Sequence, residues 1–338
     1  MEISVVISTY NRKKNILSLL NDLKNSTLIP KEVIVVDAGT DGVTNEDILR
    51  FENLNIHLLY SSLPSVCVQR NLGIQVACCP WIFICDDDMG VPRDYLEKIH
   101  HHIATHQDAG AVSGLVLQRD KNDNWEAFYP IRSSKELMLK FFFGLSIWGE
   151  IQCASDNYLI KWIKTYYKKK ENHISASGWP VITNISGDYF TVPVFGLGAS
   201  LIRKSWLQES PYEERLDTHG IGDHYGVALG FPSTGIHIVK DAFVYHYHEQ
   251  TNRLEKSLQY YRRVLALDYF ISTKQRLSFA KRKLFLWSLF GNGLIYILSN
   301  NRLMAKTALK TFYLVAFKKN PYLHENSKQL SGVINPIQ

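Results

Sequence analysis

The sequence lacks the signatures of several large protein classes. Its five cysteines among 338 residues are odd in number and show no Cys-x-x-Cys spacing, which argues against a disulfide framework and favours a reducing compartment. No Gly-x-Gly-x-x-Gly turn follows the first expected strand and no Gly-x-x-x-x-Gly-Lys-Ser/Thr loop occurs. A dinucleotide oxidoreductase and a P-loop nucleotide hydrolase are therefore not expected. Internal repeats and low-complexity segments are also absent.

Long apolar runs are missing as well. The longest, residues 284–298, has 15 mostly apolar residues and is broken by Gly291-Asn292-Gly293, whereas a bilayer-spanning helix needs about 20. We expect a pair of core helices there, or a segment lying in a membrane interface. Residues 2–8 resemble a strand and not a basic leader followed by an apolar run, so no signal peptide is expected and the protein is predicted to be cytoplasmic.

Charge is distributed unevenly along the chain. The net charge is +6, yet residues 252–320 hold 14 lysines and arginines against only Glu255 and Asp268, so this stretch carries +12. Aromatic residues such as Trp287 and Tyr313 alternate with the basic ones, as in a helix at a lipid headgroup layer. We expect an anionic membrane surface as a partner and no nucleic acid. The alternative is a helical subdomain that buries its aromatic residues against the core or in a dimer.

The first part of the chain alternates apolar strand and helix patterns. We expect strands at residues 3–8, 33–36, 56–60, 81–85 and 111–117, and helices at 14–25, 66–76 and 93–102. This alternation predicts an α/β domain with a mainly parallel sheet. Residues 120–194 are less regular, with a helix expected at 137–148, and residues from 252 onward are expected to form helices. We expect a catalytic domain at 1–250, with halves at 1–118 and 119–250, and a basic helical region at 251–338.

Three adjacent carboxylates, Asp86, Asp87 and Asp88, directly follow the fourth expected strand. In open α/β sheets, ligands bind beyond the carboxyl ends of the strands. Adjacent carboxylates repel one another, and a hard divalent cation relieves that repulsion. The simpler interpretation is a solvated acidic turn that caps the next helix.

Other polar segments are expected at the same edge of the sheet. Ser8-Thr9-Tyr10-Asn11-Arg12 follows the first strand, Asp37-Ala38-Gly39-Thr40-Asp41-Gly42 follows the second, and Gln69-Arg70-Asn71-Leu72-Gly73 lies in the third helical region. Together with the acidic cluster, in this order and spacing, these segments resemble family 2 glycosyltransferases over residues 2–250. The resemblance implies a Rossmann-like GT-A fold and a nucleotide-diphospho-sugar donor, with uracil as the common base in the family.

The resemblance also implies which residues bind the donor. The base of the donor would be held by Ser8, Thr9 and Tyr10, at the end of the first strand. Arg12, two residues further along, would also bind the donor. Asp37 would bind the base or ribose, although the family usually has two acids where this chain has Asp37-Ala38.

The remaining donor contacts implied by the resemblance come from the third helix and the acidic cluster. Arg70 would approach the diphosphate, a role suited to a guanidinium. Asp86 and Asp87 would face ribose and sugar hydroxyls, and Asp88 would ligate Mn²⁺ or Mg²⁺.

Two further segments resemble the acceptor half of the family. Residues 195–204 match its glycine-containing strand, and Gly220-Ile221-Gly222-Asp223 matches an acidic loop that usually ends in Glu-Asp. Asp223 would be the general base of an inverting transfer, since the attacking hydroxyl must lose a proton. The alternatives are Asp217 as the base, or Asp223 as a turn former or helix cap.

A final strand at residues 242–248 would complete the metal site through a histidine. His246 matches the family by position, but His248 lies on the same face of a strand, so the pattern does not separate them. His100, His101, His102 and His106 are expected on a solvated helix face, because no further zinc ligands accompany them.

The resemblance therefore implies an inverting glycosyltransferase acting on a hydroxyl acceptor. The expected acceptor is a glycan or lipid-linked oligosaccharide in cell-surface polysaccharide synthesis, and the expected location is the inner face of the cell membrane. The alternative is an inactive domain that binds a glycan or partner, because Ala38 and Gly222 replace two acids of the family and a fold alone does not imply activity.

Overall fold

The computed structural model describes residues 2–120, 122–155, 157–216, 218–247, 254–275 and 278–324. The chain forms two compact units. Unit 1 comprises Met1–Ala127, Asp188–Thr191 and Phe195–Arg253, and unit 2 comprises Phe128–Gly187, Val192–Val194 and Leu254–Gln338. This division differs from a single boundary at residue 250, because residues 128–187 cluster with the C-terminal helices instead of the large sheet.

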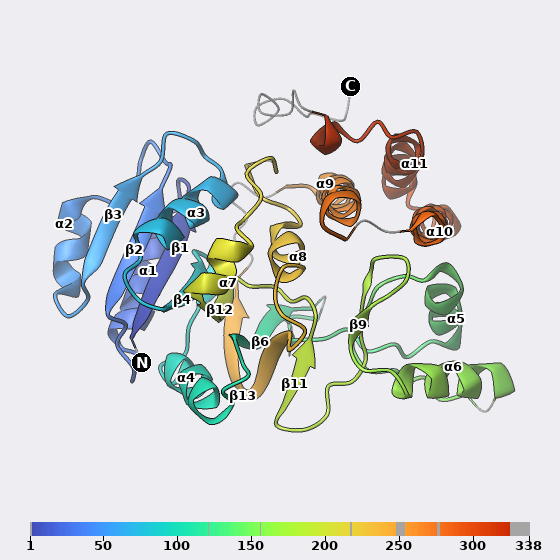
Figure 1. Cartoon of the computed structure of the whole chain (residues 1–338), viewed down its shortest axis with the longest axis horizontal. Coiled ribbons are helices and arrows are strands. Elements are labelled where there is room, and N and C mark those ends of the chain that lie inside the picture. Colours follow the sequence, from blue (N-terminus) through green and yellow to red (C-terminus); the bar gives the residue numbers. More distant parts are fainter. Residues whose placement is uncertain are drawn as a thin grey trace. The chain divides into compact units, whose positions relative to one another are not determined.

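Unit 1 contains a mixed sheet with helices packed against it (Figure 1). Its strands, in the order of the chain, are β1 (Ile3–Thr9), β2 (Glu32–Asp37), β3 (Ile56–Tyr60), β4 (Trp81–Asp86), β5 (Met89–Gly90), β6 (Ala111–Arg119), β7 (Trp125–Glu126), β11 (Tyr189–Val192), β12 (Ala199–Arg203) and β13 (Ile236–His246). Its helices are α1 (Lys13–Lys24), α2 (Asn45–Ile48), α3 (Val66–Val76), α4 (Tyr95–Thr105), α7 (Lys204–Glu209) and α8 (Asp223–Ala228), with a 3₁₀ turn at Leu49–Phe51. The main strand order is β11-β13-β6-β12-β4-β1-β2-β3.

The short apolar runs of the sequence form the parallel strands of this sheet. Every residue of β1 and β2 is buried, as expected for parallel strands covered by helices on both faces. The pairing of β1 with β2 sets Thr9 beside Asp37, and the pairing of β1 with β4 sets Ser8 beside Asp86. The carboxyl ends of three strands therefore meet at one edge of the sheet. The predicted α/β architecture with C-terminal helices is confirmed.

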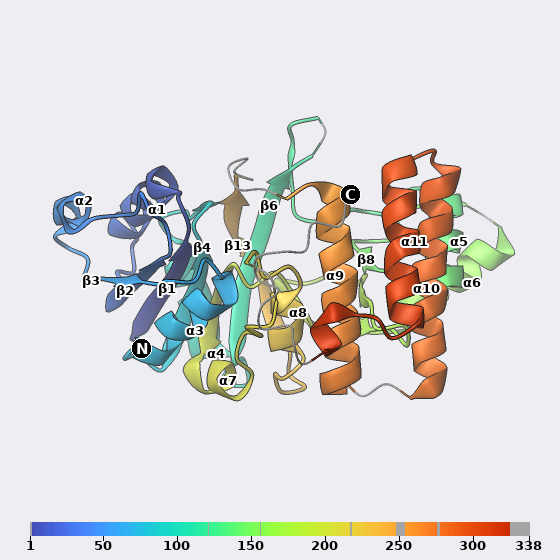
Figure 2. The same cartoon turned by 90° about the horizontal axis from the view of Figure 1, so that it is seen from above.

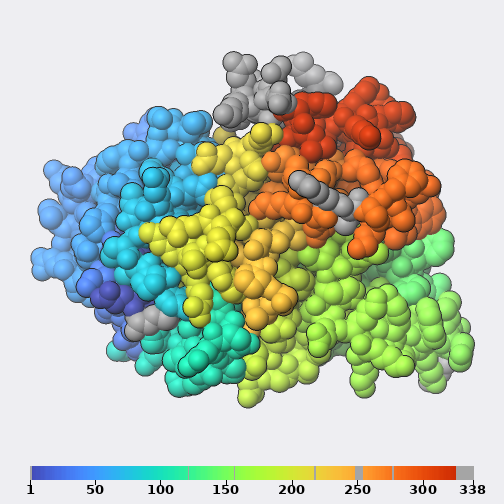
Figure 3. Space-filling model, in the orientation of Figure 1, coloured from blue at the N-terminus to red at the C-terminus, as the bar shows by residue number. Residues whose placement is uncertain are grey.

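Unit 2 combines a small sheet with longer helices. The sheet has the order β8 (Ile147–Trp148), β10 (Pro180–Ile182), β9 (His173–Ile174). The helices are α5 (Ser134–Phe143), α6 (Tyr158–Lys168), α9 (Lys256–Phe270), α10 (Phe279–Leu298) and α11 (Arg302–Ala316), with a π turn at Ile271–Gln275 and a 3₁₀ turn at Pro321–Leu323. Figure 2 shows α10 and α11 side by side, joined by a short turn. In the space-filling view of Figure 3, green residues of the 128–187 segment lie directly beside the orange C-terminal helices of the same unit.

Two predictions about unit 2 are wrong in part. The helix expected at 137–148 ends at Phe143, because Gly144 adopts a left-handed conformation with φ of 62° and the chain turns into β8. The expected break at Gly291-Asn292-Gly293 does not occur, since α10 is one continuous helix. Gly291 allows a close approach instead: a Cβ atom there would lie 2.2 Å from the Phe143 ring. Among the described residues, no helix is both long and apolar enough to cross a bilayer.

Candidate active site

The acidic turn lies at the edge where β1 and β4 end, and each of its carboxylates has a different partner. Asp87 accepts hydrogen bonds from Thr9 Oγ1 at 2.8 Å and from Arg12 Nη1 at 2.8 Å. Burial raises the pKa of Asp87 to about 6, even though the charge of Arg12 and both hydrogen bonds act in the opposite direction. Asp87 therefore ties β1 and the start of α1 to the acidic turn.

Arg70 forms the centre of the site. Its Nη2 bonds Asp86 and its Nη1 bonds Asp223, and the Arg70 side chain is only 4% exposed. The guanidinium carbon lies 5.0 Å from the centre of the Tyr212 ring. Burial opposes the charge of Arg70, but Asp86 and Asp223 outweigh it and raise the pKa of Arg70. One buried guanidinium thus joins a carboxylate of the acidic turn to the predicted general base.

Asp223 is the first residue of α8, after two glycines with positive φ, Gly220 at 59° and Gly222 at 98°. These angles favour glycine and fold the loop back, so that Asp223 N donates to Gly220 O at 2.9 Å. Asp223 Oδ1 accepts from His224 N at 2.7 Å. Asp223 therefore supports the helix start and also faces Arg70. Its predicted rival, Asp217, lies outside the described residues.

The tight pairing of β13 with β5 brings His246 to Asp88. His246 is the register partner of Met89, and its Nε2 lies 3.3 Å from Asp88 Oδ1. Burial opposes ionisation of Asp88, but the hydrogen bond and charge of His246, with the charge of Arg12, lower the pKa of Asp88. A carboxylate oxygen and an imidazole nitrogen at this separation can both ligate one divalent metal ion. His248 lies outside the described residues.

The other residues predicted to bind the donor lie at the ends of two strands, β1 and β2, at the same edge of the sheet. Ser8 is buried at the end of β1, and Tyr10 is 39% exposed just beyond it. Asp37 is buried, and its two oxygens accept from Gly39 N at 2.7 Å and Val43 N at 2.9 Å. In this structure, Asp37 therefore shapes the loop that follows β2 with both of its carboxylate oxygens.

Several residues without a role assigned from sequence support the site. Gln69 Nε2 donates to Thr9 O and Val36 O, each at 2.7 Å, which holds α3 against the ends of β1 and β2. Asn71 exchanges hydrogen bonds with the backbone of Tyr212 at 2.9 and 3.0 Å. Both flank Arg70 in the sequence, so the run of three adjacent polar residues in a largely apolar helix was the available signal.

Gly198 is a further supporting position, just before β12. Asp86 N donates to Gly198 O at 2.8 Å, and a Cβ atom on Gly198 would lie 2.2 Å from Asp86 Oδ2. Only glycine lets the Asp86 carboxylate occupy this place.

The histidines of α4 lie away from this site, and the predicted solvated face is wrong for one of them. His101 is exposed, but His102 is only 7% exposed, and its Nε2 lies 3.0 Å from His237 Nδ1 on β13. Packing of α4 on the sheet buries the ring. The helix pattern alone does not show which of three adjacent histidines points inward.

Comparison with known proteins finds similarity to glycosyltransferases. Residues 4–160 match Glycosyl transferase family 2. The chain is 34% identical over 128 residues to the uncharacterized glycosyltransferase YwdF of Bacillus subtilis (strain 168), covering 33% of this chain and 44% of that protein. It is 28% identical over 130 residues to the glycosyltransferase GlyG of Streptococcus pneumoniae serotype 4 (strain ATCC BAA-334 / TIGR4), covering 38% and 43%. The matches thus span less than half of these relatives.

Solved structures show the same fold at low sequence identity. S. aureus TarS 1-349 superposes with a TM-score of 0.51 at 16% identity, covering 96% of this chain and 83% of that one. GalNAc-T7, solved with UDP, GalNAc and Mn²⁺, gives a TM-score of 0.54 at 12% identity, covering 82% and 51%. These likenesses confirm the predicted GT-A fold. Residues 4–160 therefore match the glycosyltransferase family 2 model, and the chain has the GT-A fold.

Proposed function

We propose that the chain is an inverting glycosyltransferase that moves a sugar from a nucleotide-diphospho-sugar to a hydroxyl acceptor. The observation that carries the proposal is the pair of bonds made by Arg70, to Asp86 of the acidic turn and to Asp223 at the start of α8. A donor-binding carboxylate and a candidate base are thereby held on either side of one buried cation.

In the proposed reaction, Asp223 takes the proton from the acceptor hydroxyl as that oxygen attacks the anomeric carbon of the donor. A bond from the acceptor oxygen to this carbon forms while the bond from the carbon to the diphosphate oxygen breaks, and the nucleoside diphosphate leaves with the electron pair. Attack on the face opposite the leaving group inverts the anomeric centre. Arg70 orients the Asp223 carboxylate, because a guanidinium fixes the direction of the oxygens that it bonds.

Asp88 and His246 are the residues that would hold a divalent cation. Their 3.3 Å separation and their oxygen and nitrogen donors fit Mn²⁺, while Mg²⁺ prefers oxygen ligands throughout. The bound cation would supply positive charge to the leaving diphosphate. Asp86 and Asp87 would contact ribose and sugar hydroxyls, as the family resemblance implies.

The nucleotide would bind at the ends of β1 and β2. Tyr10 offers an exposed ring for the base beside the loop that Asp37 holds. Two similar structures support the first choice of donor and metal to test. S. aureus TarS 1-349 was also solved in complex with UDP-GlcNAc, and this structure gives a TM-score of 0.52. GalNAc-T7 was solved with UDP and Mn²⁺, so UDP-linked sugars and Mn²⁺ are tested first.

A panel of nucleotide-sugars tests the proposal through metal-dependent release of nucleoside diphosphate. With the best donor, Asp223→Asn should keep donor affinity and lose about two to four orders of magnitude in turnover, the usual scale for a lost general base. Asp241→Asn, an exposed acid elsewhere in unit 1, is the matched control and should remain active. Near-normal transfer by Asp223→Asn would remove Asp223 from this role, and retention of anomeric configuration in the product would exclude the single-base mechanism.

The second candidate function is a glycan-binding module without activity. It is favoured only by Ala38 and Gly222, which stand where the family usually has acids. Glycan binding without nucleotide release from any donor in the panel would support the module.

We further propose a peripheral location at the inner face of the cell membrane, with a glycan or lipid-linked oligosaccharide of cell-surface polysaccharide as the acceptor. Unit 2 supports this location, because by sequence it holds 22 lysines and arginines against seven aspartates and glutamates. Each basic residue near an anionic surface contributes about 1 kcal/mol. Liposome flotation should show binding that requires anionic lipid and weakens with salt. Full recovery in the soluble fraction at low salt would contradict it.

A further inference from the structure

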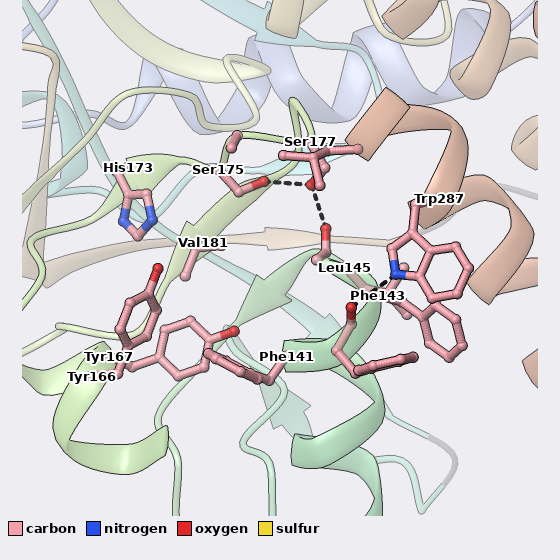
Figure 4. Close-up of a pocket in the computed structure, with 14 residues that line it drawn as sticks. Phe141, Phe143, Leu145, Tyr166, Tyr167, His173, Ser175, Ser177, Val181 and Trp287 are labelled. Atoms are coloured by element: carbon pink, nitrogen blue, oxygen red, sulfur yellow. Dashed lines mark hydrogen bonds between the residues drawn. The ribbon is translucent and has the colours of Figure 1, made fainter. Parts of the chain in front are cut away.

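Unit 2 contains a pocket of about 200 Å³ that lies within this unit alone. Its walls come from α5, α6, α10 and the turn between β9 and β10. Figure 4 shows Phe141, Tyr166 and Tyr167 along one side and Trp287 on another. A cavity of about 150 Å³ with apolar walls is large enough for benzene. The pocket therefore has room for a short length of hydrocarbon.

The rings that line the pocket form two packed groups. Phe141 contacts Tyr166 with ring centres 5.4 Å apart and Tyr167 at 6.0 Å. On the other side, Trp287 contacts Phe143 at 5.1 Å and Phe142 at 5.5 Å. These contacts hold the walls in place without filling the space between them, so the pocket is a built feature of the fold.

Four of the polar side chains of the lining already have partners inside the protein. Trp287 Nε1 donates to Phe142 O at 3.0 Å, and Ser177 Oγ donates to Gly144 O at 2.5 Å. Ser175 Oγ lies 2.8 Å from Ser177 Oγ, and the Tyr166 hydroxyl accepts from Lys170 at 2.6 Å. A sugar ring would need unpaired donors and acceptors, because a buried polar group without a partner is costly. A hydrocarbon needs none.

The mouth of the pocket exposes apolar side chains to solvent. Phe142 is 64% exposed, Leu284 44% and Trp287 38%. These three exposed apolar side chains line the same pocket, whereas apolar residues on an ordinary surface are scattered singly. Exposed apolar patches of this kind mark binding sites. Water excluded from these side chains would favour an apolar ligand.

The charge around the pocket selects the head group of such a ligand. Lys170 Nζ lies 4.4 Å from the centre of the Tyr166 ring, at one wall. Lys283 precedes Leu284 in α10, and unit 2 carries +15 by sequence while the rest of the chain carries −9. A hydrocarbon chain that ends in an anionic group therefore matches both the lining and its surroundings.

We propose that this pocket binds the hydrocarbon chain of an anionic amphiphile, with the head group in the basic surroundings of the pocket. The inference goes beyond the proposed transferase function, since it concerns unit 2 alone and needs no catalysis. Two sources have this chemistry, a straight acyl chain of a membrane lipid and a branched isoprenoid chain of a lipid-linked acceptor.

Binding of alkyl phosphates below their micelle concentrations tests the proposal by calorimetry on the full chain. In the series from butyl to dodecyl phosphate, affinity should rise about fourfold per added methylene, the factor that corresponds to burying one such group. The rise should stop once the chain fills the pocket. Dodecyl maltoside, which is uncharged, should bind at least tenfold more weakly than dodecyl phosphate. Comparison of dodecyl with farnesyl phosphate distinguishes the two sources, and preference for either supports the pocket.

Three variants localise the binding. Ala176→Trp adds a large side chain at an exposed lining position, and Phe142→Ala removes a ring at the mouth. Each should weaken dodecyl phosphate binding at least tenfold. Phe317→Ala is the matched control, because Phe317 is also 64% exposed and lies just after the last residue of α11, outside the lining.

Several outcomes would overturn the inference. Absence of saturable binding to any alkyl or farnesyl phosphate would do so, as would equal affinity for the maltoside. Equal losses in Phe142→Ala and Phe317→Ala would indicate general surface binding. Because these measurements contain no donor and no sugar transfer, their failure leaves the proposed transferase reaction unaffected, and loss of transfer in Asp223→Asn leaves the pocket unaffected.

Discussion

Replacement of Arg70 by methionine tests whether the site depends on one buried cation. Methionine keeps most of the length and apolar volume of the side chain and removes only the guanidinium. The change leaves Asp86 and Asp223 close together without their shared partner, and their side chains are 26% and 9% exposed. Two carboxylates in that position repel each other and are poorly solvated.

The size of the effect follows from this geometry. Breaking a buried ion pair by removing one partner usually costs about 3–5 kcal/mol. Water reaches Asp86 and can solvate it in part, so the lower end applies, and we expect the free energy of unfolding to fall by about 3 kcal/mol at pH 7. The Arg70→Lys variant should lose less stability, because it keeps the positive charge. It should still lose activity, because a single ammonium group cannot donate hydrogen bonds to two carboxylates in the planar geometry of a guanidinium.

Urea denaturation followed by circular dichroism measures this loss. The double variant Arg70→Met/Asp223→Asn should lose less than the sum of the single variants, because it also removes one of the stranded charges. Lys31→Met is the control, since it breaks an exposed ion pair with Glu2, and it should leave stability unchanged. A loss below about 1 kcal/mol for Arg70→Met would refute the account of Arg70 as the cation that holds the site together.

Three further predictions follow from other contacts. Asp88→Ala should abolish Mn²⁺-dependent donor binding in calorimetry, and unchanged affinity with Mn²⁺ present would remove Asp88 as a metal ligand. Gly198→Ala should displace the Asp86 carboxylate and weaken donor binding about 10- to 100-fold, the range for a hydrogen bond to a charged group, whereas Gly196→Ala, which has nothing within 4 Å of its added carbon, should bind normally. Burial, with the charges of His106 and His237, lowers the pKa of His102 to about 4 from 6.5, so the folded state takes up fewer protons than the unfolded one. Stability should therefore fall by up to about 3 kcal/mol as pH drops from 6.5 to 4, and His102→Gln should flatten that slope in urea titrations at several pH values.

The sequence by itself determined the sheet and the edge at which the site lies. The apolar runs of β1, β2 and β4 are buried on both faces, and each run stops at a polar residue, Thr9, Asp37 or Asp86. Parallel strands share one carboxyl edge, so the order of strand and polar turn along the chain was enough to predict that Thr9, Asp37 and Asp86 lie at the same edge of the sheet. Local patterns of this kind depend on neighbours only a few residues away.

Only the tertiary structure decided the pairings between distant elements. Arg70 and Asp223 are 153 positions apart in the sequence, and no periodicity links them. Likewise, Gly291 looks like a helix breaker in sequence, but in the fold it lies inside α10 where Phe143 packs against the helix. The conformational cost of glycine in a helix is about 1 kcal/mol, and burial of an aromatic ring outweighs it. Pairings like these depend on which surfaces meet after folding, and that information is spread over the whole chain.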